Sequence, residues 1–387
     1  MLKIEKDGED MTGWKEYRLN DLGEILDSRR IPLSSLERAK RQGQYPYYGA
    51  SGIIDYIDDY LFEGEHVLIS EDGENLLSRN TPIAFIVSGR FWVNNHAHIF
   101  KGNAPYINRI VMHYLQSSDL NEFITGAAQP KLSQRSLLSI PFYLPAEPVE
   151  QKAIAAILSS LDDKIDLLHR QNATLEAMAE ALFRQWFVVE AKEEWEDITV
   201  ADLAIINQQS KNKNYPYQEI KYLDTGSLTN GIFEGFQNYH LDGAPSRAQR
   251  LVKHNDILIS LVRPNQKHYG IIKKPSQNLV VSTGFCVLTC KNMNPHFLYL
   301  FLTSNEMTEF LHSVAEGSTS AYPALVPSDI ANLELKRPPA EKLSEFSSYA
   351  DSAWEKITHN QTQIRTLKKL RDTLLPKLMS GEVRVEC

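Results

Sequence analysis

Apolar residues recur at every third or fourth position over two long stretches of this chain. In the first stretch, residues 148–188, the polar residue Asn172 interrupts the apolar series. The series consists of Ile154, Leu158, Leu161, Ile165, Leu168, Leu175, Ala179, Leu182 and Trp186. This spacing predicts a helix, and a stripe that continues over several heptads favours a partner helix over the face of a globular core. At ~1.5 Å per residue, a helix of this length spans about 60 Å.

The same spacing returns 192 residues later, from position 154 to position 346, and continues to residue 378. Here Asn360 and Arg371 are the polar interruptions. An antiparallel pairing of the two helices about their centres would place Asn172 opposite Asn360. A buried pair of asparagines fixes the register of two helices at some cost in stability. Pro376 is a potential break in the second helix before Leu378.

Three short segments of the first half also return in the second half, in the same order. They are residues 14–22 and 195–203, residues 44–47 and 214–217, and residues 65–70 and 255–260. A repeat of this length indicates a duplicated structural unit. The expected layout is a flexible N-terminus (1–13), a globular domain (14–145), a central helix (146–190), a second domain (195–338), and a C-terminal helix with its tail (339–387).

Within each domain, short apolar or alternating runs predict strands, and one helix follows them. The predicted strands are residues 52–57, 66–70, 83–87, 257–262 and 279–288, and the predicted helices are residues 106–115 and 297–302. Each helix is entered through an Asn and a Pro, at residues 103–105 and 294–295. The pattern predicts an α+β fold: two similar strand-rich domains separated by two long helices in an antiparallel coiled coil, related by an internal pseudo-two-fold repeat.

Composition narrows the class of protein further. The net charge is −8, and no apolar run approaches the ~18 residues that a membrane span requires. The N-terminal ten residues are charged and polar, unlike a signal peptide, so we expect a cytoplasmic protein with no membrane contact. Three cysteines, Cys286, Cys290 and Cys387, cannot form a disulfide framework. Cys286 and Cys290 are expected to be buried thiols rather than metal ligands.

Signatures of catalysis are missing from the sequence. It contains no phosphate-binding glycine loop, no zinc-protease helix motif and no nucleophile elbow. His96 and His98 are two residues apart, as two metal ligands on one face of a strand would be. We expect instead that they form hydrogen bonds and bind no metal. Residues 294–297 are similar to the tetrapeptide with which amino-methyltransferases hold a target amino group. An asparagine N-cap followed by proline explains them better, so we predict that the chain has no catalytic residues.

Loop residues suited to nucleic acid form the remaining candidate site. Arg, Lys, Asn, Gln and Tyr side chains anchor phosphates and read base edges. In the first domain the candidates are Arg29, Arg30, Lys40, Arg41, Tyr45, Tyr47, Asn94, Asn95, Gln129 and Lys131. In the second domain they are Lys211, Lys213, Tyr215, Arg263, Gln266, Lys267, His268, Tyr269, Ser320 and Tyr322.

Charge balance gives weight to the alternative, a solvated basic face. Residues 14–145 contain 13 Lys and Arg against 15 Asp and Glu, and residues 195–338 contain 13 against 13. Neither domain has the positive excess of a stand-alone DNA binder. The loops at 126–133 and 317–325 occupy equivalent places with different side chains. These loops either recognise two different target sequences or are structural turns that lead into the last strand of each domain.

The arrangement resembles the specificity subunit of type I restriction–modification systems. Residues 165–187 resemble the central helix of that family and residues 370–383 its C-terminal helix, while residues 45–52 with 94–98 resemble one class of its target-recognition domains. The resemblance implies that each domain reads one half of a bipartite site in double-stranded DNA. It also implies that the coiled coil sets the spacer and binds two modification subunits, which restriction subunits then join.

The same resemblance places the chemistry on the partners. S-adenosylmethionine with adenine-N6 methylation belongs to the modification subunits, and ATP with Mg²⁺ to the translocating restriction subunits, so this chain needs no cofactor. Two other classes stay open on sequence alone. One is a duplicated structural adaptor that does not bind DNA, and the other is a DNA methyltransferase in its own right.

Overall fold

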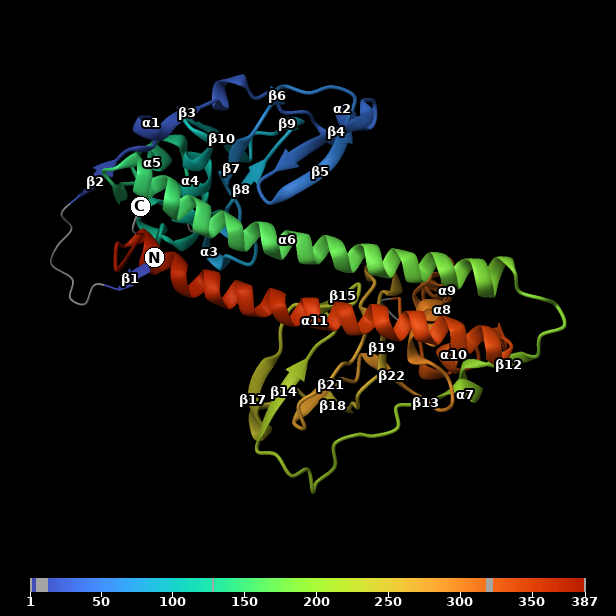
Figure 1. The fold of residues 1–387 in the computed structure, drawn as a ribbon. Coiled ribbons are helices and arrows are strands. Elements are labelled where there is room, and N and C mark those ends of the chain that lie inside the picture. The colour runs from blue at the N-terminus through green and yellow to red at the C-terminus, as the bar shows by residue number, and fades with distance from the viewer. Residues whose placement is uncertain (1, 5–12, 127–128, 318–322, 386–387) are drawn as a thin grey trace. The chain divides into compact units, whose positions relative to one another are not determined.

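The computed structural model describes residues 2–4, 13–126, 129–317 and 323–385. The chain divides into two compact units, residues 1–167 with 363–387, and residues 168–362. Each unit contains one strand-rich domain together with one half of each long helix (Figure 1). The two long helices are α6 (Pro148–Arg184) and α11 (Ala340–Met379).

The domain of the first unit contains ten strands and five α-helices in its described residues. The strands are β2 (Trp14–Tyr17), β3 (Gly23–Ile25), β4 (Gln42–Gly49), β5 (Gly52–Ile57), β6 (Phe62–Glu63), β7 (His66–Ser70), β8 (Ala84–Val87), β9 (Arg90–Val93), β10 (Ala97–Gly102) and β11 (Phe142–Pro145). The helices are α1 (Leu19–Leu22), α2 (Ser35–Ala39), α3 (Asn75–Ser78), α4 (Pro105–Ser117) and α5 (Gln134–Ser139). Two 3-10 turns lie at Asp27–Arg29 and Asn121–Phe123.

The domain of the second unit is likewise built from short strands and short helices. Its strands are β12 (Asp197–Thr199), β13 (Ala204–Ile206), β14 (Glu219–Leu223), β15 (Leu228–Thr229), β16 (Ile232–Phe233), β17 (Gln237–His240), β18 (Ala248–Leu251), β19 (Ile257–Ser260), β20 (Tyr269–Ile271), β21 (Leu279–Ser282), β22 (Phe285–Cys290) and β23 (Glu334–Lys336). Its helices are α7 (Val200–Leu203), α8 (Pro295–Thr303), α9 (Asn305–Glu316) and α10 (Pro327–Ala331). Two 3-10 turns lie at Leu241–Gly243 and Pro264–Gln266.

Sheet topology shows the duplication directly. One four-stranded sheet has the order β3-β10-β7-β8 in the first unit and β13-β22-β19-β20 in the second. The other has the order β5-β4-β9-β6 in the first and β17-β14-β21-β18 in the second. In both versions of this second sheet the central pair, β4 with β9 and β14 with β21, is parallel and the outer pairs are antiparallel. Matching order and direction confirm the predicted repeat and the α+β class.

Each domain opens and closes on a paired strand. β2 pairs with β11 in the first unit, and β12 pairs with β23 in the second. The domain boundaries expected from the sequence, 14–145 and 195–338, stay predictions, although these strand pairs lie next to them. Of the N-terminal residues expected to be flexible, Leu2–Ile4 instead form β1, which pairs with β24 (Val383–Val385) in the same unit.

The two long helices pack antiparallel within each unit. In the first unit, Ile154 and Leu158 of α6 share a buried core with Leu375 and Leu378 of α11. In the second unit, the C-terminal part of α6 meets the N-terminal part of α11, so that Ala179, Phe183, Phe346 and Ala350 are buried in one cluster. The apolar stripe read from the sequence is therefore the buried seam. Helix α6 continues into one turn of π-helix at Gln185–Val189.

Three local expectations need correction. Pro376 lies inside α11 and does not end it, since the helix continues to Met379. The run at residues 279–288 is two strands, β21 and β22, with a break between Ser282 and Phe285. The N-cap of α4 is Ala104 and not Asn103, whose side chain instead donates a hydrogen bond to the carbonyl of Asp21.

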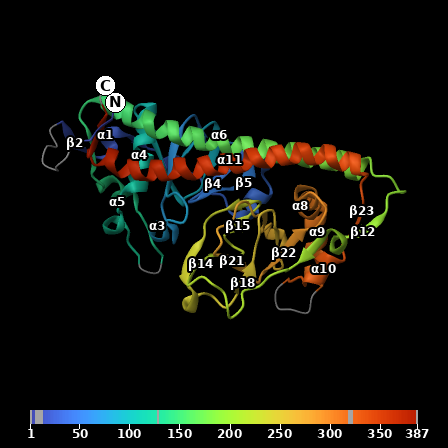
Figure 2. The same cartoon turned by 60° about the horizontal axis from the view of Figure 1, so that its bottom comes forward.

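The two views place α8 and α9 next to α11, with the sheet of β14, β18 and β21 on the side away from that helix (Figures 1 and 2). Ring contacts support this packing, since Tyr299 of α8 lies edge-on to Trp354 of α11. None of the helices in the described part of the chain is long and apolar enough to cross a membrane.

Candidate nucleic-acid interface

The basic stretch predicted as a phosphate anchor is mostly paired within its own domain. Arg30 is the clearest case: its side chain is 15% exposed, and Nη1 lies 2.7 Å from Glu71 Oε2. Arg41 Nε lies 2.9 Å from Asp58 Oδ1, and the guanidinium of Arg41 stacks over Trp92. Both guanidinium groups are thus engaged within their own domain, and a phosphate contact by either arginine stays a prediction.

Two cations of this stretch remain more accessible. Arg29 is exposed, although its guanidinium stacks over Phe62 and donates a 3.3 Å hydrogen bond to the carbonyl of Leu61. The ammonium group of Lys40 makes no hydrogen bond or ion pair with other residues that the structure describes. Lys40 is therefore the better candidate for a phosphate contact.

The aromatic candidates divide in the same way. Tyr47 is fully buried, and its hydroxyl accepts a 2.8 Å hydrogen bond from the backbone N–H of Leu33, so it is a core residue and not a contact residue. Tyr45 is half-buried and packs against Tyr60 with 5.1 Å between ring centroids. The structure separates two tyrosines that the sequence treats alike. Tyr47 lies where β4 is paired on both sides, with Asp55 of β5 and Trp92 of β9, whereas Tyr45 precedes the part of β4 that pairs with β9.

Three chain segments of the first unit meet beyond the C-terminal end of β7. They are residues 71–72, which follow β7, residues 94–96, which precede β10, and residues 129–132. The backbone N–H of Glu71 donates to the carbonyl of His96, and the N–H of Leu132 donates to the carbonyl of Glu71. We call these segments the first loop cluster.

Four polar side chains of the first loop cluster are exposed: Asn95, His96, Gln129 and Lys131. Asn95, Gln129 and Lys131 were predicted as contacts, and the fold brings them together. Asn94 was also predicted, but it is 7% exposed and its Oδ1 accepts the backbone N–H of His96, so its amide supports the turn.

A buried ionic network lies beneath the first loop cluster. His98 is fully buried; its Nδ1 lies 2.5 Å from Asp27 Oδ2 and its Nε2 lies 2.8 Å from the carbonyl oxygen of Leu132. Glu71 Oε1 lies 3.1 Å from the ammonium of Lys131, and Glu71 Oε2 is bonded to Arg30. Burial would raise the pKa of Glu71, but hydrogen bonds from Arg30 and Lys131 and the nearby His98 hold it below its usual value.

The sequence did not identify this network. Asp27, Glu71 and His98 offer ligand atoms within 4.8 Å of one another, a spacing that could hold a metal ion. Arg30 and Lys131 already supply two positive charges to the same carboxylates, so a cation would face repulsion there. Both histidines form hydrogen bonds, as expected: His96 lies in the turn before β10 and contacts Asp72, and His98 lies on β10 itself.

Candidates in the second unit lie on two different loops. Lys213 is exposed and Lys211 is half-buried, whereas the ring of Tyr215 packs against Tyr217 with its hydroxyl buried. The second loop follows β19 and contains the 3-10 turn at Pro264–Gln266. Arg263 and Lys267 flank this turn with left-handed backbone conformations, φ +47° and +55°.

The side chains of the second loop are held from several sides. Lys267 Nζ donates to Asn305 Oδ1 at 3.0 Å, and His268 Nδ1 lies 2.7 Å from the carbonyl oxygen of Leu228. Gln266 is exposed, and its amide oxygen lies 3.1 Å from His268 Nε2. Tyr269, another predicted contact, is 8% exposed and donates its hydroxyl to Asn230 Oδ1, so it is a core residue.

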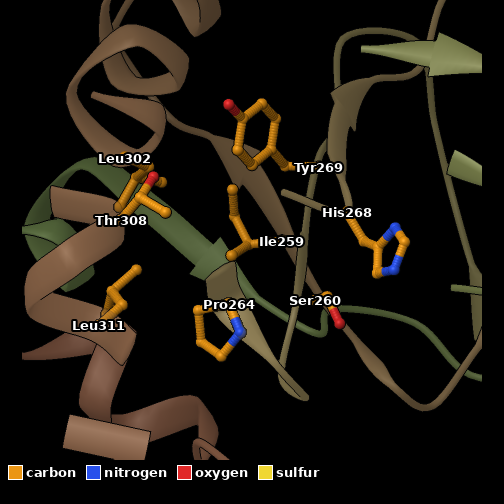
Figure 3. A pocket seen from close by; sticks show the side chains of 8 residues that line it. All are labelled: Ile259, Ser260, Pro264, His268, Tyr269, Leu302, Thr308 and Leu311. Atoms are coloured by element: carbon orange, nitrogen blue, oxygen red, sulfur yellow. The ribbon is translucent and has the colours of Figure 1, made fainter. Parts of the chain in front are cut away.

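A small pocket lies beneath this loop, and Figure 3 shows its lining. The lining residues are Ile259, Ser260, Pro264, His268, Tyr269, Leu302, Thr308 and Leu311. Helix α9 contributes Thr308 and Leu311 on one side, while the imidazole of His268 lies on the other side and points away from them (Figure 3). The pocket is the packing boundary between α9 and the loop. The remaining candidates of this unit, Ser320 and Tyr322, lie outside the described residues.

Asn294 has a structural role. Its Oδ1 accepts hydrogen bonds from the backbone N–H groups of His296 and Phe297, and its Nδ2 donates to Asp351 of α11. Both ends of the amide are therefore used, which removes the methyltransferase-like interpretation of residues 294–297. Burial raises the pKa of Cys286 to about 12, as expected for an inert thiol, and the same effect acts on Cys290.

By its fold, the protein is a duplicated α+β protein with exposed polar loops on each domain and with long helices that pack against each other within each unit. A family model described as type I restriction modification DNA specificity domain matches residues 11–177 and 192–373. The chain therefore belongs to the family of type I restriction–modification DNA specificity proteins.

Relatives and a solved structure agree with this family. The type I restriction enzyme MjaIX specificity subunit of Methanocaldococcus jannaschii is 25% identical over 429 aligned positions, covering 99% of this chain and 95% of the relative. A Haemophilus influenzae protein provisionally named type I restriction enzyme specificity subunit S.HindORF215P is 39% identical over 148 residues, 38% of this chain and 37% of that protein. The crystal structure of a type I restriction–modification S subunit from M. genitalium matches with a TM-score of 0.58 at 15% identity, covering 94% of this chain and 96% of that one, which shows a shared fold.

Proposed function

We propose that this chain is the DNA-specificity subunit of a type I restriction–modification complex. Each domain reads one half of a bipartite site in double-stranded DNA, and the paired helices set the separation of the two halves. The observation that supports this best is the duplication itself. Two domains with the same strand order present loops of different chemistry, as two readers of different half-sites require.

The equivalent loops differ in charge. In the first unit, Asp72 pairs with Lys131 through a β-bridge, and in the second unit Val262 forms the same bridge with Ala324. A shared backbone frame with unlike side chains supports different base preferences in the two domains. A plain structural turn would not need an exposed lysine beside a half-buried carboxylate at this place in one copy.

We assign the first contacts as follows. Asn95, Gln129 and Lys131 of the first loop cluster are the candidates for reading base edges, because amides and ammonium groups match the hydrogen-bonding pattern of the major groove. Lys40 and, in the second unit, Lys211 and Lys213 are the candidates for phosphate contacts. Arg263, Gln266 and His268 are the candidates for base contacts in the second unit.

The chain itself is proposed to be non-catalytic. Two modification subunits, which bind S-adenosylmethionine and methylate adenine N6, dock on the helices and domains, and restriction subunits that use ATP and Mg²⁺ join them. Near-neutral domains fit this arrangement, since partner subunits supply part of the contact with the DNA backbone.

The test is to map methylated adenines in DNA from cells that carry this chain with its modification subunit. The expected result is one bipartite motif, with two short specific halves and a fixed unspecific spacer. Exchanging the first domain for that of a relative should change one half and leave the other half unchanged. A single uninterrupted motif, or the same motif in cells without this chain, would contradict the proposal.

A further inference from the structure

Two charged or titratable residues of the buried network under the first loop cluster, Glu71 and His98, are replaced by other residues at the equivalent described positions of the second unit. His98 lies opposite Ile69 across β10 and β7, and Cys286 lies opposite Ile259 across β22 and β19. By strand order and pairing, His98 and Cys286 therefore hold the same position in the two copies of the sheet.

The loop that follows extends this equivalence. The N–H of Leu132 donates to the carbonyl of Glu71 in the first unit, and the N–H of Leu325 donates to the carbonyl of Leu261 in the second. Glu71 thus corresponds to Leu261. The pair of Glu71 and His98 in one unit is matched by Leu261, 9% exposed, and Cys286, fully buried, in the other.

This comparison shows that the fold does not need a glutamate and a histidine at these two positions. The same sheet order and the same backbone hydrogen bonds form around a leucine and a cysteine in the second unit. Taking Asp27, Glu71 and Arg30 out of water is unfavourable, and apolar side chains of similar size often replace such buried ion pairs without loss of stability. Stabilisation of the fold is therefore not a sufficient reason for the pair of Glu71 and His98.

Its contacts indicate that purpose. The Nε2 atom of His98 bonds to the carbonyl of Leu132, next to Lys131, while its Nδ1 atom bonds to Asp27. Arg30 bonds to the carbonyl of Ala97, next to the turn with Asn95 and His96, and to Glu71. One continuous set of directional bonds thus fixes both segments of the first loop cluster that carry exposed polar side chains.

We propose that Asp27, Arg30, Glu71 and His98 are positioning residues that hold the first loop cluster in the geometry with which the first domain reads its half-site. None of them is proposed to touch DNA. This inference rests on the proposed function, and it deepens it by separating the residues that place the reading loops from the residues that read. Base recognition depends on this placement, because bidentate hydrogen bonds to base edges tolerate little displacement.

The experiment uses the complete chain assembled with its modification subunit. The double variant Glu71→Leu with His98→Cys gives the first unit the side chains that the second unit has at these positions. It keeps Asp27 beside Arg30, whose Nη2 lies 3.5 Å from Asp27 Oδ2, so that no buried charge loses its opposite charge. The milder variant His98→Gln replaces the ring N–H by an amide N–H, and serves if the double variant fails to fold.

The control is His113→Gln. His113 is also buried in the first unit, 1% exposed, and also lies near a carboxylate, with Nε2 3.2 Å from Asp162 Oδ2 on α6. It contacts a long helix and not the first loop cluster. Any effect of removing a buried histidine in general would therefore appear in the control as well.

The expected result concerns one half of the motif. The network variants should lose base preference in one half and weaken binding of the complete site about tenfold or more, as a mismatched base pair does. The other half, the dependence of binding on salt concentration and the thermal unfolding midpoint should stay as in the wild type. Retention of both half-site preferences in a folded variant, or equal loss in His113→Gln, would overturn the inference. If the wild-type complex itself showed no bipartite motif, the proposed function would have failed instead.

Discussion

The side-chain amide of Asn360 on α11 donates a hydrogen bond to Oδ1 of Asn172 on α6 over 2.9 Å. Asn360 is fully buried and Asn172 is 8% exposed, so this polar pair lies inside the apolar seam of the second unit. It is the pairing that the spacing of the two stretches predicts. A buried polar pair of this kind favours one register, because any shift leaves an amide without its partner.

The asparagine pair leads to the first prediction. Asn360→Leu leaves the amide of Asn172 without its partner and should lower the free energy of unfolding by ~1–3 kcal/mol. The double variant Asn172→Leu with Asn360→Leu should recover this loss, because two apolar side chains suit the seam. Urea denaturation of the four proteins of this double-mutant cycle measures the coupling. Additive losses in the double variant would show that the two side chains act independently.

A second prediction concerns Asp162 in the first unit. Burial would raise the pKa of this carboxyl, but His113 and Arg371, which lie 3.2 Å and 2.9 Å away, hold it below its usual value. A carboxyl with a depressed pKa stabilises the fold above its unfolded pKa of about 4, and the contribution is lost as the pH falls through the folded pKa. Arg371→Ala should therefore cost ~1–2 kcal/mol at pH 7 and less at acid pH.

The matched control for this prediction is Asp372→Asn. Asp372 also contacts Arg371, at 2.9 Å, but its side chain is 63% exposed, so solvent screens the pair. We expect this variant to leave the stability profile unchanged within a few tenths of a kcal/mol. Unfolding midpoints between pH 3 and pH 7 supply the comparison. A loss of equal size in Asp372→Asn would argue against burial as the reason.

A third prediction has the opposite sign and concerns Glu176 on α6. Burial, with the neighbouring Glu180, raises the pKa of Glu176 to about 7. Because the folded state then binds a proton that the unfolded state releases, stability falls as the pH rises from about 4.5 to 7 and is level above that range. Glu176→Gln should raise the free energy of unfolding by about 2 kcal/mol at pH 8 and change it little at pH 4. An equal gain at both pH values would disprove this assignment.

A fourth prediction separates free cations from paired ones in DNA binding. Each phosphate contact adds ~0.9 to the slope of log affinity against log salt concentration. Lys40→Gln and Lys213→Gln should each reduce the slope by about one, since these lysines are exposed and neither forms a salt bridge with a described residue. Arg41→Gln should leave the slope unchanged, because Arg41 is already paired with Asp58. Titrations of the assembled complex at several salt concentrations decide the matter.

Much of the fold was readable from local pattern. The helices α6 and α11, their antiparallel pairing, the duplication and the strand at Gly52–Ile57 follow from spacing that repeats within one element or between two copies. Apolar periodicity is a local property, because a helix or strand shows its buried face in its own sequence. The Asn294 cap was readable for the same reason, since donor and acceptor lie within three residues.

The candidate site was readable only in part. The sequence predicted Asn95, Gln129 and Lys131 as DNA contacts, and the fold brings these exposed residues together. It predicted the buried Tyr47 and the half-buried Arg30 as contacts in the same way. Whether a tyrosine faces solvent or core depends on which strand pairs with its own. That pairing joins residues far apart in the chain, so a single sequence does not contain it.

Only the tertiary structure decided which charges are available. Asp27, Glu71 and His98 are separated by 44 and 27 positions in the sequence (71 − 27 and 98 − 71), yet their polar atoms lie within 4.8 Å of one another. The sequence determined two paired helices and two copies of one domain, because those depend on repeated apolar spacing. The fold determined which polar side chains neutralise one another and which face outward, because electrostatic pairing depends on distance in space.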